Sequence, residues 1–142
     1  MDNEQNIHQI NSFNFEGKDQ PVSFVETMHV ADGVDCDVYT FVGDTTKDLG
    51  IIRISPGSKT PLQKVLKGDR TVEGYVSGKG KLTVTKADGI QEEHVADSES
   101  EKPVVNVGIG ETMQWEADKE EDLVAYEICF PPYEDGRYEN LK

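Results

Sequence analysis

Two glutamates are the residues with the clearest potential for chemistry, because each lies in a segment that otherwise has the composition of a β-strand. Glu73 lies in TVEGYVSG (Thr71–Gly78) and Glu127 lies in LVAYEICF (Leu123–Phe130). A carboxylate in such a strand faces either solvent or the interior of the fold. Two carboxyl groups that are buried close together have raised pKa values and can act as a general acid or base. Glu73 and Glu127 are therefore a candidate two-carboxylate site.

Three more side chains are candidates for a binding site, although each has an ordinary structural alternative. Arg53 lies in LGIIRIS (Leu49–Ser55), and either face of this strand could be the inner one. In a pocket, Arg53 would pair with Glu73 or clamp a carboxylate or phosphate, whereas on the surface it would be solvated. Trp115, the only tryptophan, either packs in the core or offers a stacking surface to a sugar or an aromatic ring. The same two alternatives hold for Tyr75.

The histidines and cysteines lack the spacing of a metal site. His8, His29 and His94 are far apart in the chain, and His94 could be a ligand only in a rearranged site. Cys36 and Cys129 form no CxxC pair, and each falls in a strand-like segment. We expect both to be buried free thiols, which is the usual state in a reducing compartment.

The length of 142 residues predicts one domain with one core. No apolar run is long enough to span a membrane and no signal-peptide pattern opens the chain, so we expect a cytoplasmic protein. Residues 1–20 are expected to be flexible or to form an edge strand, and residues 21–142 to form the domain. Its C-terminal tail should pack over one end, with a turn at Asp135-Gly136 that explains the composition of PPYEDGRYENL.

The net charge of −14 comes from 28 acidic side chains against 14 basic ones. A surface of this sign repels nucleic acid and anionic membranes, whose recognition needs clustered lysine and arginine, so neither is an expected partner. The charge leaves three explanations open: a solvated acidic surface, a basic partner or cationic ligand, or a halophilic origin.

The pattern along the chain is that of short strands, since no long stretch has helical periodicity. Glycine, proline, aspartate and asparagine separate segments with strand-like composition. The expected strands are Val22–Val30, Asp35–Gly43, Leu49–Ser55, Thr71–Gly78, Lys81–Lys86, Ile90–Ala96, Val104–Gly108, Thr112–Ala117 and Leu123–Phe130. Asp88-Gly89 is typical of a type I′ turn. Short strands at roughly ten-residue spacing predict an all-β sandwich or barrel.

One glycine-bounded segment carries a recognisable motif. It opens at Gly57 and closes at Gly80, with Glu73 followed by six residues before the last glycine. This segment resembles the first motif of the cupin superfamily, G-x5-HxH-x3,4-E-x6-G, with Gln63 and Val65 at the two histidine positions. The gap from Val65 to Glu73 is a few residues longer than in the motif, which implies a longer loop, LKGDRT. The resemblance implies a cupin-type jelly-roll β-barrel, also called a double-stranded β-helix. The resemblance also implies that the strand face with Glu73 points into the barrel.

The second cupin motif is weaker and has no histidine. Gly110-Glu111 stands for the Gly-Asp turn of the family, and Glu121 falls on the histidine position. Metal-binding cupins hold iron, manganese, nickel or zinc with about three histidines and a glutamate, and of these ligands the chain keeps only Glu73. The resemblance therefore implies a site without a cofactor. A divalent metal held by Glu73, Gln63 and an unexpected histidine or acid is the alternative.

The function expected from a cupin barrel without the motif histidines is binding of a small polar metabolite, such as a sugar, in a metal-free pocket. One alternative is an enzyme that resembles sugar isomerases or epimerases, with Glu73 or Glu127 as the base. Another is a dimeric interaction module whose acidic face meets a basic partner. The residues expected to bind the ligand are Gln63, Glu73, Tyr75, Arg53, Trp115 and Glu127.

Overall fold

The computed structural model describes residues 10–98, 104–134 and 136–141. In these residues the chain forms twelve strands and no helix, which confirms the all-β prediction. They are β1 (Ser12–Phe15), β2 (Lys18–Ala31), β3 (Val34–Phe41), β4 (Asp44–Ile54), β5 (Leu62–Val65), β6 (Arg70–Gly78), β7 (Gly80–Thr85), β8 (Gln91–Ala96), β9 (Val104–Val107), β10 (Thr112–Ala117), β11 (Leu123–Phe130) and β12 (Tyr138–Leu141). The described part of the chain contains no helix that could cross a membrane.

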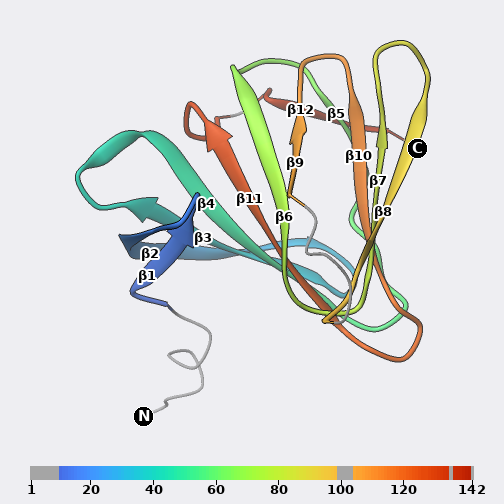
Figure 1. Cartoon of the computed structure of the whole chain (residues 1–142), viewed down its shortest axis with the longest axis horizontal. Coiled ribbons are helices and arrows are strands. Elements are labelled where there is room, and N and C mark those ends of the chain that lie inside the picture. Colours follow the sequence, from blue (N-terminus) through green and yellow to red (C-terminus); the bar gives the residue numbers. More distant parts are fainter. Residues whose placement is uncertain (1–9, 99–103, 135, 142) are drawn as a thin grey trace.

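The strands form two antiparallel sheets that face each other (Figure 1). The seven-stranded sheet has the order β1-β2-β3-β4-β11-β6-β9, and the five-stranded sheet has the order β12-β5-β10-β7-β8. Neighbours such as β4 and β11 are far apart in the sequence, so the chain crosses repeatedly from one sheet to the other. We call the face of the seven-stranded sheet that looks toward the smaller sheet its inner face, and the opposite one its outer face.

Every strand expected from the sequence is present, with ends that shift by a few residues, but β5 and β12, each of only four residues, were missed. β12 pairs with β5, so part of the C-terminal tail is an edge strand of the smaller sheet rather than a cover over one end. β1 lies at the edge of the larger sheet, within the segment 1–20 that was expected to be flexible or an edge strand; residues 1–9 lie outside the described part.

The type I′ turn expected at Asp88-Gly89 is wrong. That turn needs a positive φ at both central residues, and Glu16 is the one non-glycine residue with a positive φ in the described chain. Asp88 instead accepts a hydrogen bond from the backbone N–H of Ile90 at 3.0 Å, as an aspartate-stabilised turn does. Two consecutive residues with positive φ, as a type I′ turn needs, occur instead at Glu16 (56°) and Gly17 (80°), between β1 and β2.

Apolar side chains form two clusters, one on each face of the larger sheet. The inner cluster contains residues of both sheets, among them Ile52, Ile54 and Trp115. The outer cluster contains residues of the larger sheet alone, such as Leu49 and Tyr126. This division follows from strand alternation, because successive side chains point to opposite faces.

The outer cluster is closed by the first hairpin, which curls back across β11. The ring of Phe13 in β1 meets the ring of Tyr126 edge to face, with centroids 4.9 Å apart. Tyr126 in turn lies over Gly74, where any Cβ would overlap the tyrosine ring. A glycine is therefore required at this point of β6, and the wing formed by β1–β4 is anchored to the rest of the fold (Figure 1).

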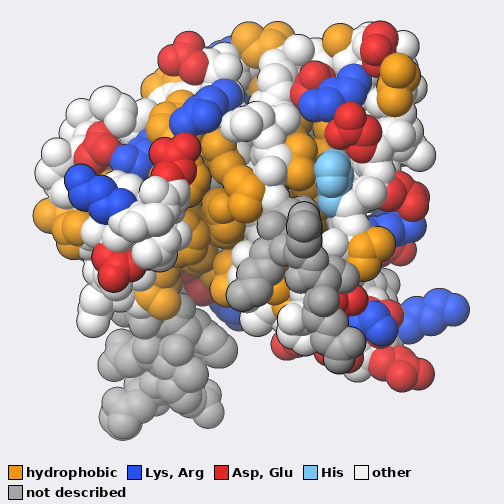
Figure 2. Space-filling view, in the orientation of Figure 1, with side chains coloured by type: hydrophobic (Ala, Val, Ile, Leu, Met, Phe, Trp, Pro, Cys, Tyr) orange, Lys and Arg blue, Asp and Glu red, His pale blue; other side chains and the backbone are white. Residues whose placement is uncertain are grey.

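The charged side chains are distributed over the surface. Figure 2 shows acidic side chains spread across the visible face and interspersed with lysines and arginines, next to an apolar area between the two halves of the molecule. On this face the acidic excess forms no single patch, as is typical of a solvated surface.

Candidate functional site

Glu73 lies on the inner face of β6, where it is buried. Alternation places Tyr75 on the same face, while the intervening Val72 belongs to the outer cluster. Only 1% of Glu73 is exposed. Its Oε1 accepts a hydrogen bond of 2.7 Å from the indole N–H of Trp115, which comes from β10 in the opposite sheet. The contact joins the two sheets in the middle of the barrel.

Glu127 lies directly beside Glu73. The two residues are cross-strand partners in the antiparallel pair of β6 and β11, so their side chains project from the same face. Glu127 is half-buried, in contrast to Glu73. The structure thus brings together the two carboxyl groups that strand alternation singled out, one sealed in the interior and the other open to solvent on one side.

The surroundings of Glu73 favour its protonated form. Burial raises the pKa of Glu73 well above its ordinary value, and the charge of Glu127 and a hydrogen bond with it raise that pKa further. The Trp115 N–H and the charge of Arg137 lower the pKa by less. The second oxygen of Glu73, Oε2, receives no hydrogen bond from the described residues. Burial and the neighbouring carboxyl group of Glu127 are thus the main causes that favour a neutral Glu73.

A chain of polar side chains continues from Glu127 toward β12. The thiol of Cys129 lies 3.8 Å from Glu127 Oε1 and 3.2 Å from the hydroxyl of Tyr138. The Tyr138 hydroxyl in turn lies 3.3 Å from Thr71 Oγ1. Burial, followed by the charge of Glu127, raises the pKa of both Cys129 and Tyr138. Both therefore stay protonated at neutral pH, and the thiol is not an activated nucleophile.

Arg137 has a structural role that the sequence did not indicate. Its side chain is buried, with one terminal nitrogen donating to the carbonyl of Pro131 at 2.9 Å. The other terminal nitrogen donates to the carbonyl of Arg70 at 2.7 Å and to Thr71 Oγ1 at 3.1 Å. Arg137 thus ties the end of β11 to the start of β6. The tail was expected to be explained by turn chemistry, and nothing local in PPYEDGRYENL reveals these distant partners.

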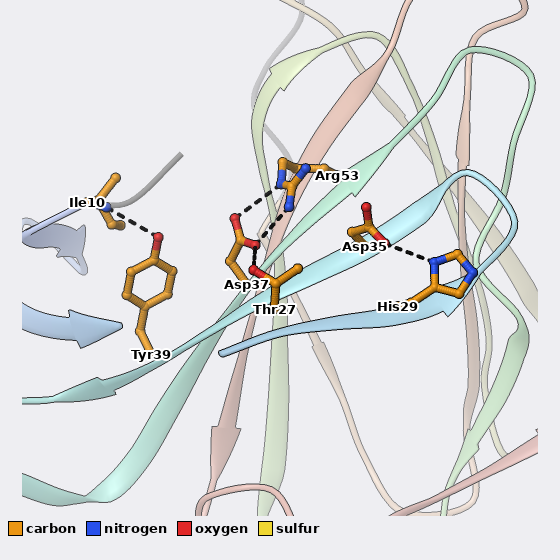
Figure 3. A network of polar contacts seen from close by, with 7 residues as sticks. All are labelled: Ile10, Thr27, His29, Asp35, Asp37, Tyr39 and Arg53. Atoms are coloured by element: carbon orange, nitrogen blue, oxygen red, sulfur yellow. Dashed lines mark hydrogen bonds and ion pairs between the residues drawn. The ribbon is translucent and has the colours of Figure 1, made fainter. Parts of the chain in front are cut away.

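Arg53 lies on the outer face and does not meet Glu73. It forms a two-point ion pair with Asp37, with Nε 3.1 Å from Oδ2 and Nη2 2.8 Å from Oδ1 (Figure 3). The hydroxyl of Thr27 donates to the same carboxylate at 2.8 Å. Asp37 is 2% exposed, so the pair is largely withdrawn from water. The suggested pairing of Arg53 with Glu73 is wrong, because the inner side chains of β4 are its neighbours Ile52 and Ile54.

The other candidate residues are occupied by contacts within the protein. Tyr75 and Trp115 are buried in the inner cluster, and the Tyr75 hydroxyl donates to the carbonyl of Gly78 at 2.9 Å. Gln63 opposes Met113 of the inner cluster and is half-buried, and its amide donates to Asn140 Oδ1 at 3.1 Å. Of the six sequence candidates, Glu127 alone combines an inner position with a carboxylate open to solvent.

The residues at the cupin motif positions do not fit a metal ion of the first transition row. Such ions prefer imidazole and carboxylate ligands. Val65 is buried in the apolar cluster, the Glu73 carboxyl is hydrogen-bonded to Trp115, and Glu121 is exposed in a loop. His94 lies on the edge strand β8, 3.3 Å from Glu92. The described residues contain no group of three or more histidine, cysteine, aspartate or glutamate side chains placed to hold a metal.

Comparison with known proteins gives a match in structure and none in sequence. No protein-family model matches the chain, and no curated protein sequence matches it. Oxalate decarboxylase from Bacillus subtilis, a protein with Mn(II) centres, superposes with a TM-score of 0.66 at 21% identity, over 82% of this chain and 30% of its own. The capsular polysaccharide assembling protein CapF from Staphylococcus aureus gives 0.63 at 16%, over 86% of this chain and 32% of its own.

A third similar structure is a cupin-2 domain from Rhodospirillum rubrum, with a TM-score of 0.61 at 12% identity, over 92% of this chain and 79% of its own. The chain spans about a third of the length of CapF and of oxalate decarboxylase. The likeness at these identities concerns the fold alone. Together with the two facing sheets and their strand order, it confirms what the motif between Gly57 and Gly80 implied: the protein has the jelly-roll fold of the cupin superfamily.

Proposed function

We propose that the protein binds a small polar molecule between its two sheets, at the Glu73–Glu127 pair, without a metal. The observation that carries this proposal is the pairing of a buried acid with a half-buried carboxylate on the inner face of the barrel. Burying a carboxyl group costs free energy even when it is hydrogen-bonded or neutral, and such perturbed groups are concentrated at functional sites. Ligand sites usually combine apolar walls with a few convergent polar groups.

The chemistry of the pair suits a ligand with hydroxyl groups. A protonated Glu73 can donate a hydrogen bond, while Glu127 can accept one or more. A sugar presents both donors and acceptors, which makes it one fitting ligand class. Trp115 does not provide a stacking surface in this proposal, because it is buried and its N–H is bound to Glu73.

A ligand screen with two variants tests the proposal. Thermal unfolding is measured with a panel of sugars and small polar metabolites, and the hits are titrated by calorimetry. Glu127→Gln should weaken binding of a true ligand by about tenfold or more, because it removes the accessible carboxylate. Glu120→Gln makes the same change of charge at an exposed loop position and should leave the affinity unchanged. Equal affinity in both variants contradicts the proposal.

An enzymatic role is the second candidate, favoured by the position of two carboxyl groups side by side on one face. With Glu73 as acid and Glu127 as base, the pair could move a proton on a bound sugar, as isomerases and epimerases do. Exchange of a carbon-bound hydrogen of the ligand with deuterium from solvent would support this role. Binding of the ligand without such exchange would contradict the enzymatic role and support ligand binding alone.

A second copy of the chain is the proposed protein partner. The edge of β2 beyond Pro21 pairs with no other strand among the described residues, and Val25, Met28 and Val30 are exposed there. We also assign the protein to the cytoplasm within this proposal, because Cys36 and Cys129 are free thiols of the kind that a reducing compartment maintains.

A further inference from the structure

We propose that β8 is a docking edge for an extended, basic segment of a partner protein, which adds to the smaller sheet as a further strand. The Glu73–Glu127 pair belongs to the other sheet, so this inference does not rest on the proposed function. It follows from the free side of β8, from the regularity of its pairing and from the charges along it.

The backbone of β8 has a side that no other strand covers in the described part of the chain. β8 ends the order of the smaller sheet, with β7 as its neighbour. The backbone N–H of Lys86 donates to the carbonyl of Ile90 at 2.8 Å, and hydrogen-bonded pairs alternate along antiparallel strands. Counting from Ile90, Glu93 and Val95 therefore direct their backbone N–H and C=O groups away from β7. An extended segment beside β8 can pair with these groups by β-augmentation.

β8 is longer than the other strands that end the two sheets, and it is regular. β1, β9 and β12 contain four residues each, whereas β8 contains six. Its register with β7 runs from Gln91 to Ala96 without a shift, in contrast to the interrupted pairing of β2 with β3. Short or bulged edges resist the addition of another strand. β8 has neither of these protections, so its charges are what protects it.

Those charges are negative. β8 contains two adjacent glutamates, Glu92 and Glu93, and no lysine or arginine. Their side chains are 41% and 56% exposed. Each forms a surface ion pair, Glu92 with His94 at 3.3 Å and Glu93 with Lys81 at 3.4 Å. Such pairs contribute little free energy in water, so both carboxylates can accept a second cation.

The negative charge determines which strand can add to this edge. A second copy of β8 in antiparallel alignment would place Glu92 and Glu93 opposite each other, and like charges at opposed positions destabilise a pair of strands. A strand with two adjacent lysines or arginines places opposite charges there instead. Val95, which lies on the same face as Glu93 and is 59% exposed, offers an apolar contact beside the charges. The edge is thus closed to itself and open to a basic strand.

The probe is the peptide TVTKKTV with both ends capped. In antiparallel alignment its two lysines oppose Glu93 and Glu92, and its first valine opposes Val95. Calorimetry at low ionic strength, where screening is weak, compares it with TVTQQTV and TVTEETV. TVTKKTV should bind at least about tenfold more tightly than TVTQQTV, because it adds two charge pairs to the same backbone contacts. TVTEETV should not bind.

Two double variants of the protein locate the site. Glu92→Gln with Glu93→Gln should lower the affinity for TVTKKTV to that for TVTQQTV. Glu120→Gln with Glu121→Gln makes the same change of charge at two adjacent exposed positions of a loop, and it should retain the affinity. Equal affinities of the two variants for TVTKKTV would show attraction to the overall charge of −14 and would overturn the inference.

Methylation of the peptide backbone separates strand addition from attraction between charges. In the proposed alignment the N–H of the first lysine, opposite Glu93, points toward β8, and the N–H of the second lysine points away. Methylation of the first nitrogen should abolish binding, whereas methylation of the second should leave it largely unchanged. Equal effects of the two methyl groups, or no binding of TVTKKTV at all, would show that β8 does not accept a strand.

Discussion

Burial and the neighbouring Glu127 raise the pKa of Glu73, and this makes the stability of the protein depend on pH. Its folded-state pKa is raised, so between its ordinary value of 4.5 and the raised value the folded state binds more protons than the unfolded state. By linkage, the free energy of unfolding then falls as pH rises through this window, and Glu73 has no such effect below both pKa values.

Glu73→Gln should remove this dependence. Glutamine can accept the Trp115 hydrogen bond with its oxygen and donate to Glu127 with its amide, much as the protonated acid does. We expect the variant to equal the wild type at low pH and to be the more stable of the two as pH rises. Urea unfolding followed by circular dichroism from about pH 5 to pH 9 measures the difference. If the free energies of unfolding of the variant and the wild type differ by the same amount at every pH in this range, Glu73 does not take up a proton on folding.

Trp115 should matter through its N–H as well as its ring. Trp115→Phe keeps an aromatic ring but leaves Glu73 Oε1 buried without a donor. We expect this loss to lower the free energy of unfolding by about 1–3 kcal/mol, in addition to the cost of the smaller ring. Repeating the substitution in the Glu73→Ala background isolates the hydrogen bond, because the acceptor is absent there. Equal costs in the two backgrounds would show that the contact contributes nothing.

Composition was sufficient to single out Glu73 and Glu127 as candidates, but their pairing comes from the register of β6 with β11, which alternation within one strand does not encode. Nor could Arg53 be placed, since alternation does not say which face is inward. The partners of Arg137 could not be predicted at all. They come from β6 and the end of β11, and no local pattern encodes a contact between a tail and a distant strand.

At the scale of elements, the contact between the buried Asp37 and Arg53 adds a side-chain link to the backbone ladder of β3 and β4. Arg53→Met keeps much of the apolar stem but leaves the Asp37 carboxylate with Thr27 as its remaining side-chain partner. Removing one member of a buried ion pair costs about 3–5 kcal/mol, and the partial exposure of Arg53 places the expected loss near the lower limit.

The pair formed by His29 and Asp35 is the matched control, because it joins the adjacent strands β2 and β3 on the surface (Figure 3). His29 is mostly exposed, and His29→Ala should cost less than about 1 kcal/mol. Urea unfolding of both variants measures the two losses. A small effect of Arg53→Met would show that the Asp37 carboxylate is well solvated without its partner. Ligand binding should be unchanged in both, because they lie on the outer face.

The strands that were predicted are the ones with a pattern to recognise. Segments such as Leu49–Ser55 and Leu123–Phe130 are long enough to show alternation or an apolar run between turn residues. β5 and β12 contain four residues each, LQKV and YENL, which carry no such signal. They are strands because each pairs with the other, and that pairing is a property of the tertiary fold.

For the whole molecule, the fold could be predicted and the ligand could not, for a physical reason. The motif residues Gly57 and Gly80 serve the fold whatever it binds: Gly57 has a positive φ of 78°, and a Cβ at Gly80, the first residue of β7, would lie 2.2 Å from the carbonyl oxygen of Glu116. The motif positions that would hold a metal have other roles here: Val65 belongs to the apolar core, and Glu73 is hydrogen-bonded to Trp115. The scaffold and the site are thus separate properties of the sequence.

The last prediction concerns a dimer formed through β2. Val25 and Val30 interrupt the regular pairing of β2 with β3, so they twist this edge and limit strand addition. Contact between two copies should therefore run through the exposed side chains of Val25, Met28 and Val30.

Each copy carries a net charge of −14, so the copies repel each other at low ionic strength. Light scattering coupled to size exclusion should show a dimer fraction that rises with salt, because salt screens this repulsion. Met28→Lys should lower that fraction, whereas Val95→Lys, at an exposed position of the edge strand β8, should not. A monomer at every salt concentration, or equal effects of the two lysines, would show that β2 is not the contact.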